Sequence, residues 1–325
     1  MTAWVPPPGA ELTTKRGLPY HQLLRGGFQP VWWRSLVGVL ALAAAMLLVL
    51  PLLVMVPFAV YYGATGQEVG SSVARLVNLR QPTPAGLAYL NLALAGLIPA
   101  AWVLIRFLHG LRPRWLSSVF PRLRWRYLFV CFGLSFLALI ATLFVSALLP
   151  QQADTSMAGE LNDFTPMIRD FMLVVLFLTP LQAAAEEYAF RGYLTQAFGG
   201  LFRSPVLAVG ASSLLFALAH GAQDPPIFFD RFAFGLVAGT LVVLTGGLEA
   251  GIAMHVLNNW LAFGIALAYG NMSSTLNPTG GTWWSIPVTL TQSVTYLLLA
   301  WWVARRMGLT TRSDPAVLAA PEARV

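Results

Sequence analysis

Acidic, imidazole and amide side chains recur at four-residue spacings inside apolar stretches of this 325-residue chain. Glu186 and Glu187 are followed by Arg191 within one such stretch. In an α-helix, residues four apart share a face, so Glu187 can pair with Arg191 while Glu186 points about 100° away. The spacing therefore predicts one structural acid and one acid available for chemistry.

A second stretch carries His255 and Asn259, which are also four apart and should project from one helix face toward the same neighbour. His220 ends an apolar run and precedes Gly221, where a helix is expected to end or break. If the three helices pack with these faces inward, a carboxylate, two imidazoles and an amide line one cavity.

This set of side chains can support peptide hydrolysis, which needs an activated water, an acid for the leaving amine and donors for the developing oxyanion. A zinc mechanism stays open, because Glu186, His220 and His255 would make a His/Glu ligand set with an open position. The chain contains no HExxH sequence, which excludes the common zincin arrangement. Asn259 is a poor zinc ligand but a good hydrogen-bond donor, so metal-independent glutamate chemistry is favoured over zinc.

The elements that must position these residues are membrane helices. The chain is 57% hydrophobic and only 10% charged, with a mean hydropathy of +0.67, whereas soluble domains carry about 25% charged residues. A span needs about 20 apolar helical residues. We therefore expect an all-α, polytopic transmembrane helical bundle of about eight spans, at residues 35–62, 86–108, 127–149, 171–198, 205–220, 228–244, 248–269 and 286–303.

The basic residues predict the topology. The net charge of +7 comes from arginines and Lys15 that lie mostly in short connections, which indicates the positive-inside rule rather than nucleic-acid binding. The expected organisation is a polar cytoplasmic N-terminal segment (1–34), a transmembrane domain (35–306) with its catalytic core at 171–260, and a cytoplasmic tail (307–325). We expect a multi-pass protein of the cell membrane with both termini cytoplasmic and flexible. His21 and His109 should lie at the surface or the membrane interface.

Three motifs in order carry a family resemblance. Glu186–Arg191 reads EExxxR, Phe216–His220 reads FxxxH and His255–Asn259 reads HxxxN. On successive predicted membrane helices, they resemble the CPBP family of intramembrane proteases, which includes CAAX prenyl proteases, bacteriocin-processing enzymes and Abi-type proteins. The resemblance covers residues 171–260.

The resemblance implies a role for each motif residue. Glu186, with His220, would activate water, and His255 and Asn259 would stabilise the oxyanion. Glu187 and Arg191 would hold the fourth helix in its rotation. The partners would be the lipid bilayer and a membrane-associated peptide or protein, lipidated or not, with no nucleic acid and no cofactor other than the zinc of the alternative mechanism.

Structural roles and other functions are also compatible with these residues. The acids could pair with arginines at the cytoplasmic interface, and His255 and Asn259 could be interhelical hydrogen-bonding residues. A transporter or proton relay is a second hypothesis, and the absence of a recognisable internal repeat weighs against it. A third is a non-catalytic membrane scaffold. Asp230 and Arg231 are interpreted as topology or local pairing residues.

Overall fold

The computed structural model describes residues 17–29, 32–148, 160–221 and 224–319. The topology markers Lys15 and Arg16 lie outside these residues, as do positions 1–16 and 320–325 of the two terminal segments. The described part is helical and contains no β-strand, only two isolated β-bridges. The predicted all-α bundle is thus confirmed.

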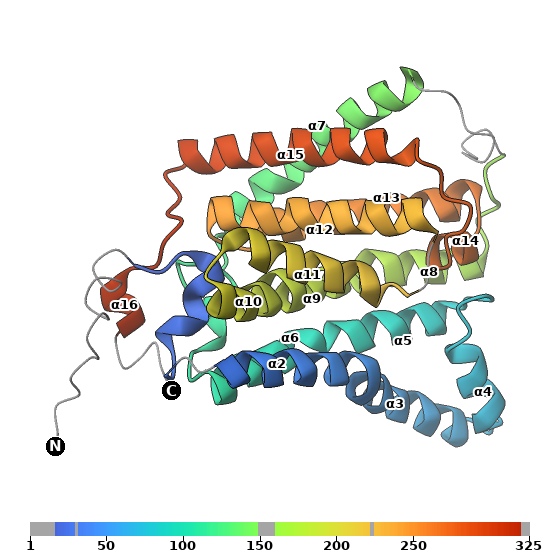
Figure 1. Cartoon of the computed structure of the whole chain (residues 1–325). Helices are drawn as coiled ribbons and strands as arrows, with labels where there is room; N and C mark the ends of the chain where they lie inside the picture. Colours follow the sequence, from blue (N-terminus) through green and yellow to red (C-terminus); the bar gives the residue numbers. More distant parts are fainter. Residues whose placement is uncertain (1–16, 30–31, 149–159, 222–223, 320–325) are drawn as a thin grey trace.

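The helices follow one another through short connections (Figure 1). In chain order they are η1 (Tyr20–Gly26), α2 (Trp32–Ala44), η2 (Ala45–Val49), α3 (Leu50–Ala64), α4 (Val69–Leu76), α5 (Pro84–Ala95), α6 (Leu97–Val103), η3 (Leu104–Leu108), η4 (Pro113–Leu116), α7 (Trp125–Leu148), α8 (Pro166–Phe177), α9 (Thr179–Glu186), η5 (Glu187–Leu194), α10 (Thr195–Phe202), α11 (Pro205–Ala219), α12 (Pro225–Thr245), α13 (Glu249–Tyr269), α14 (Met272–Leu276), α15 (Ser285–Arg306) and α16 (Pro315–Ala319).

Seven continuous helices in the described residues are long and apolar enough to cross a membrane. They correspond to seven of the eight predicted spans. The exception is α11, whose 15 residues extend about 22 Å at 1.5 Å per residue, less than a hydrocarbon core of about 30 Å. The chain therefore has seven full-length candidate spans and one shorter apolar helix, which ends at His220.

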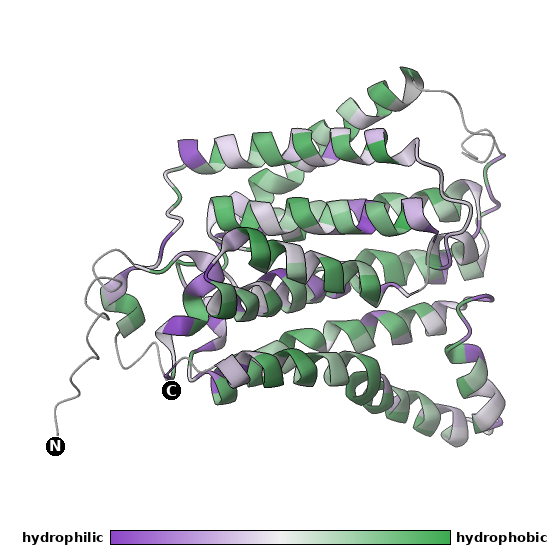
Figure 2. Ribbon diagram, viewed as in Figure 1, coloured by the Kyte–Doolittle hydropathy of each residue, from purple (hydrophilic) through white to green (hydrophobic). Residues whose placement is uncertain are grey.

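Local sequence explains where the helices of the site begin. Thr165 accepts a hydrogen bond from the Ile168 amide at the start of α8, and Ser204 does the same for the Leu207 amide at the start of α11. Each cap is followed by proline at the first helical position, where its missing N–H costs nothing. Large apolar side chains stay exposed around the bundle, as on Leu52 and Phe144, which suits contact with lipid tails. Figure 2 shows that hydrophobic residues predominate along the long helices.

The helices of the site lie in the middle of the bundle. Helix α9 packs mainly against α5 and α13, while α13 also packs on α7 and α12 packs on α11. In Figure 1, α2, α3, α5 and α6 lie on one side of these central helices, and α7 and α15 lie on the other. Residues that face inward from α9, η5, α11 and α13 are thereby enclosed by protein.

The described parts of the terminal segments are packed, which corrects the expectation of flexible tails. Tyr20 and Leu23 are fully buried, and η1 lies against α10. Residues 19 and 312 form an antiparallel bridge, and the Leu18 amide donates to Ser313 Oγ at 3.0 Å. Apolar side chains in the N-terminal segment make this packing favourable, and the bridge places both described ends at one end of the bundle.

Two histidines expected at the surface or the membrane interface are buried instead. His21 and His109 are 4% and 5% exposed, and His109 Nε2 lies 2.9 Å from the Tyr193 hydroxyl. Arg124, one of the basic residues between the second and third predicted spans, donates through its guanidinium to both carboxylate oxygens of Glu249 at 2.8 and 2.6 Å. Glu249 is fully buried, so this bidentate pair joins the start of α7 to the first turn of α13.

Candidate active site

The helix that carries the acidic pair is irregular. A single run from Pro166 to Phe202 contains α8, α9, η5 and α10, with a break at Leu178 just before Pro180. From Glu187 to Leu194 it is a π-helix. The α-helical geometry assumed from the sequence is therefore wrong over these eight residues. Wider π-turns are uncommon and often occur at functional sites.

Glu187, Arg191 and His255 form a buried cluster. Arg191 Nη1 lies 3.1 Å from Glu187 Oε1, so the ion pair expected from the sequence is present. His255 Nδ1 lies 2.9 Å from the same oxygen. The Arg191 guanidinium also sits over the Phe216 ring at 3.9 Å from its centroid. All three polar residues are at most 5% exposed, so the cluster is buried where η5, α11 and α13 meet.

A glycine provides the space for this cluster. A Cβ atom at Gly251 would lie 2.6 Å from Glu187 Oε2, closer than real Cβ contacts. Gly251, His255 and Asn259 follow one another at four-residue spacing on α13. They form a stripe that faces the helix of the acidic pair. The sequence reasoning missed Gly251, although its position four residues before His255 was the available signal.

Glu186 and Asn259 are connected through Gln182, which the sequence reasoning also missed. Gln182 Nε2 donates to Glu186 Oε1 at 2.7 Å, and Asn259 Nδ2 donates to Gln182 Oε1 at 3.1 Å. A carboxylate only accepts hydrogen bonds, so the Gln182 amide must turn its NH₂ toward Glu186 and its oxygen toward Asn259. Gln182 precedes Glu186 by four residues on α9, which places both on one face.

The second oxygen of Glu186 faces His255. Glu186 Oε2 lies 3.4 Å from His255 Nε2 and has no hydrogen-bond partner among the described residues. Because Nδ1 of His255 donates to Glu187, a neutral ring presents only a lone pair at Nε2. The approach of Nε2 and Oε2 is therefore attractive only with a proton on one of them. One proton shared between the two side chains would make this contact favourable.

His220 follows the last residue of α11. Its Nδ1 lies 2.8 Å from the carbonyl oxygen of Phe216, which accepts, so Nδ1 carries the proton and Nε2 is the basic nitrogen of a neutral ring. The nearby charges that act on the ring include Glu186 and Arg231. Arg231 was interpreted from the sequence as a topology or pairing residue, and the structure adds that its charge acts on this histidine.

The described residues do not form a zinc site. No group of three or more His, Cys, Asp or Glu side chains among them is arranged to hold a metal ion. The two nitrogens of His255 face the carboxylate oxygens of Glu186 and Glu187, and Nδ1 of His220 faces a backbone carbonyl. The alternative ligand set of Glu186, His220 and His255 is therefore not preassembled, and we derive no step through a metal.

Comparison with known proteins agrees with this geometry. Residues 168–261 match the family described as type II CAAX prenyl endopeptidase Rce1-like. This segment is thus similar to the Rce1-like family. It contains α9, η5, α11 and α12 and most of α13, and thus every residue of the three motifs. Similarity to an endopeptidase family, on a chain whose described residues include seven helices able to span a membrane, supports a multi-pass membrane protease.

One relative extends the similarity beyond the Rce1-like segment. The uncharacterized protein YyaK of Bacillus subtilis (strain 168) is 25% identical over 220 residues, which is 64% of this chain and 72% of that protein. No solved structure matches the chain. The family resemblance inferred from the three motifs is thus confirmed, while the roles of individual residues stay predictions.

Proposed function

We propose that this Rce1-like protein is an intramembrane endopeptidase that hydrolyses a peptide bond of a membrane-associated or C-terminally modified substrate. The observation that carries the proposal is the asymmetry of Glu186. Gln182 holds one carboxylate oxygen at 2.7 Å, while the other has no hydrogen-bond partner among the described residues and lies beside an imidazole. A carboxylate held in this way can orient a water and take its proton.

Hydrolysis follows from the arrangement in two steps. Glu186, assisted by His220, removes a proton from water as the water oxygen attacks the carbonyl carbon of the scissile bond. The resulting oxyanion is stabilised by donors from His255 and Asn259. The carbon–nitrogen bond then breaks, and the proton held in the Glu186–His255 pair passes to the leaving amine. The amide of Asn259 has a second N–H besides the one donated to Gln182, which is available for the oxyanion.

Glu187 and Arg191 act as positioning residues in this mechanism. Glu187 holds His255 through Nδ1, which sets the orientation of the ring and leaves Nε2 to face Glu186. Arg191 neutralises Glu187 in an environment where an unpaired charge would cost several kcal/mol. The pair therefore keeps the imidazole oriented without contacting the substrate.

We infer the substrate class from the matched family and from the apolar helix surfaces around the site. The matched family is described by its action on prenylated CAAX sequences, and the helices around the site present apolar surfaces to the membrane. A peptide with a lipid on or near its C-terminus suits such surroundings, since the lipid stays in the bilayer. We propose that cleavage takes place at the cytoplasmic side of the cell membrane, the side on which the positive-inside rule is expected to place most of the arginines.

The test is cleavage of a panel of C-terminal peptides, prenylated and unmodified, by the purified full-length protein. Glu186→Gln keeps the shape of the side chain but removes the base, so we expect at least about a hundredfold loss of kcat/KM. Glu160→Gln is the matched control, because Glu160 is exposed and outside the site. Wild-type activity in a folded Glu186→Gln protein would contradict the proposal.

A chelator arm separates the two chemistries. Metal-independent chemistry predicts unchanged activity after chelation. Loss of activity with the chelator and recovery with zinc would replace it by a metal mechanism. Solute flux into proteoliposomes that depends on Glu186, without any peptide cleavage, would support the transporter hypothesis instead.

A further inference from the structure

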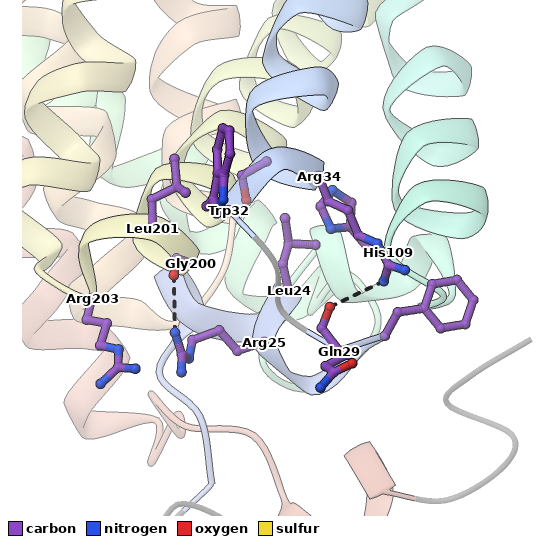
Figure 3. Close-up of a pocket in the computed structure, with 11 residues that line it drawn as sticks. Leu24, Arg25, Gln29, Trp32, Arg34, His109, Gly200, Leu201 and Arg203 are labelled. Atoms are coloured by element: carbon purple, nitrogen blue, oxygen red, sulfur yellow. Dashed lines mark hydrogen bonds between the residues drawn. The ribbon is translucent and has the colours of Figure 1, made fainter.

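A cavity beside η1, near the first described residues of the chain, is separate from the active site. Its volume is about 360 Å³, and it is lined by the ends of η1, α10 and η3 and the start of α2 (Figure 3). Three of its lining residues are arginines, namely Arg25, Arg34 and Arg203. No aspartate or glutamate lines it. The cavity thus concentrates positive charge without a carboxylate to balance it.

The three guanidinium groups have donors to spare. Arg25 Nη1 donates to the Gly200 carbonyl at 3.2 Å and Arg34 Nη1 to the Gln29 carbonyl at 3.3 Å, as Figure 3 shows. None of the three forms an ion pair with a carboxylate in the part of the chain that the structure describes. Each guanidinium has five N–H donors in a planar fork, so most of them stay available for an anion.

Electrostatic crowding supports the same conclusion. Burial and then the positive charge of Arg203 lower the pKa of Arg25, yet an arginine stays charged at neutral pH. His109 also lines the cavity, and burial followed by the charge of Arg34 lowers its pKa to about 4. The histidine is therefore neutral, and the arginines alone provide the charge. A bound anion would relieve the repulsion between Arg25 and Arg203.

The apolar part of the lining indicates where the anion comes from. Trp32 and Phe28 line the cavity and are 68% and 42% exposed, and Trp32 begins the first candidate span. Aromatic residues at the start of a span lie at the level of lipid headgroups. Basic pockets between helices at the cytoplasmic side suit anionic headgroups. A soluble anion would not need the exposed aromatic residues.

We propose that this cavity binds the phosphate headgroup of an anionic phospholipid, with Arg25, Arg34 and Arg203 as its ligands and Trp32 beside the glycerol and upper acyl region. Arginine forks bind phosphate through paired charge-assisted hydrogen bonds. The alternative, in which these arginines only enforce topology, predicts no saturable and no lipid-selective binding.

The test is binding of phosphatidylglycerol to the full-length protein in detergent, followed by thermal shift and by native mass spectrometry. We expect saturable stabilisation by phosphatidylglycerol and none by phosphatidylcholine. The variant Arg25→Gln/Arg203→Gln should bind at least about tenfold more weakly, since it loses two charge-assisted contacts. The matched control is Arg305→Gln/Arg306→Gln, which removes the same charge at the end of α15, outside the cavity, and should bind like the wild type.

Equal binding by the cavity variant and the control would overturn the proposal, as would equal binding of the two lipids. Inorganic phosphate is tested alone and as a competitor. Stabilisation by phosphate that equals the effect of the lipid would assign the cavity to a soluble anion instead. Should the double variant fail to fold, a photoactivatable phosphatidylglycerol tests the wild type directly. Crosslinks are then expected in residues 24–35 or 200–203, and crosslinks elsewhere only would refute the site.

Discussion

Replacing Gly251 by alanine should disturb the active site although no motif residue is replaced. The added Cβ would lie 2.6 Å from Glu187 Oε2, and ordinary contact begins at 3.4 Å, so the carboxylate must move by about 0.8 Å. Glu187 has little freedom for that movement, because it is fully buried and bonded to Arg191 and His255. A shift directed away from α13 would lengthen the 2.9 Å contact with His255 to about 3.7 Å, beyond a hydrogen bond.

The expected magnitude follows from these distances. Loss of a hydrogen bond to a charged group costs about 1.5–3 kcal/mol, and alanine in place of glycine inside a helix returns about 0.5–1 kcal/mol. The net destabilisation should be about 1–2 kcal/mol. For activity, a misplacement of about 1 Å costs up to about a hundredfold, so kcat should fall roughly ten- to hundredfold while KM changes little.

The assay compares Gly251→Ala with Gly264→Ala in peptide cleavage and in thermal unfolding. Gly264 lies on the same helix, and a Cβ there meets nothing within 4 Å. The control should therefore keep wild-type activity and unfold at the same temperature or slightly higher. Equal behaviour of the two variants would refute the inference that Gly251 is needed to place Glu187 and His255.

Three further predictions concern residues outside the motifs. Gln182→Ala removes the donor to the proposed base and should lower kcat about tenfold with KM unchanged. The control Gln292→Ala removes a hydrogen bond of the same length, 2.7 Å, from another glutamine amide and should leave kcat unchanged. Equal kinetics of the two variants would refute the positioning role of Gln182. Glu249→Gln removes the buried carboxylate that pairs with Arg124 and should destabilise the protein by about 3 kcal/mol. The double variant Arg124→Met/Glu249→Leu should recover most of this loss in thermal unfolding. The folded-state pKa of His109 is lowered to about 4 from 6.5, so the unfolded state gains a proton first as the pH falls. Stability should decline between pH 6.5 and 4 by at most about 3 kcal/mol, and His109→Gln should flatten that decline; identical pH profiles would contradict it.

Much of the architecture could be predicted because the bilayer imposes it locally. A run such as residues 248–269 must be a helix, since its backbone polar groups have no water to bond in the membrane. The motif residues were found for the same reason, because polar side chains such as Glu186 and His255 are conspicuous in apolar helices. The bounds of α11 were predicted within one residue, but it was counted as a full-length span although it is too short for one. The apolar run suggests a span, but its cap at Ser204 and its end at Ala219 leave only 15 residues.

The sequence by itself determined the helical membrane fold, the family and the set of chemical groups, because each depends on residue type and short-range spacing. Only the tertiary structure decided that Gln182 joins Glu186 to Asn259 and that Gly251 makes room for Glu187. It also placed His109 in a buried contact with Tyr193 and paired Arg124 with the buried Glu249. These features depend on distances between α9, η5, α13 and their neighbours. Such distances arise from the packing of residues far apart in the chain, which spacing along one helix does not specify.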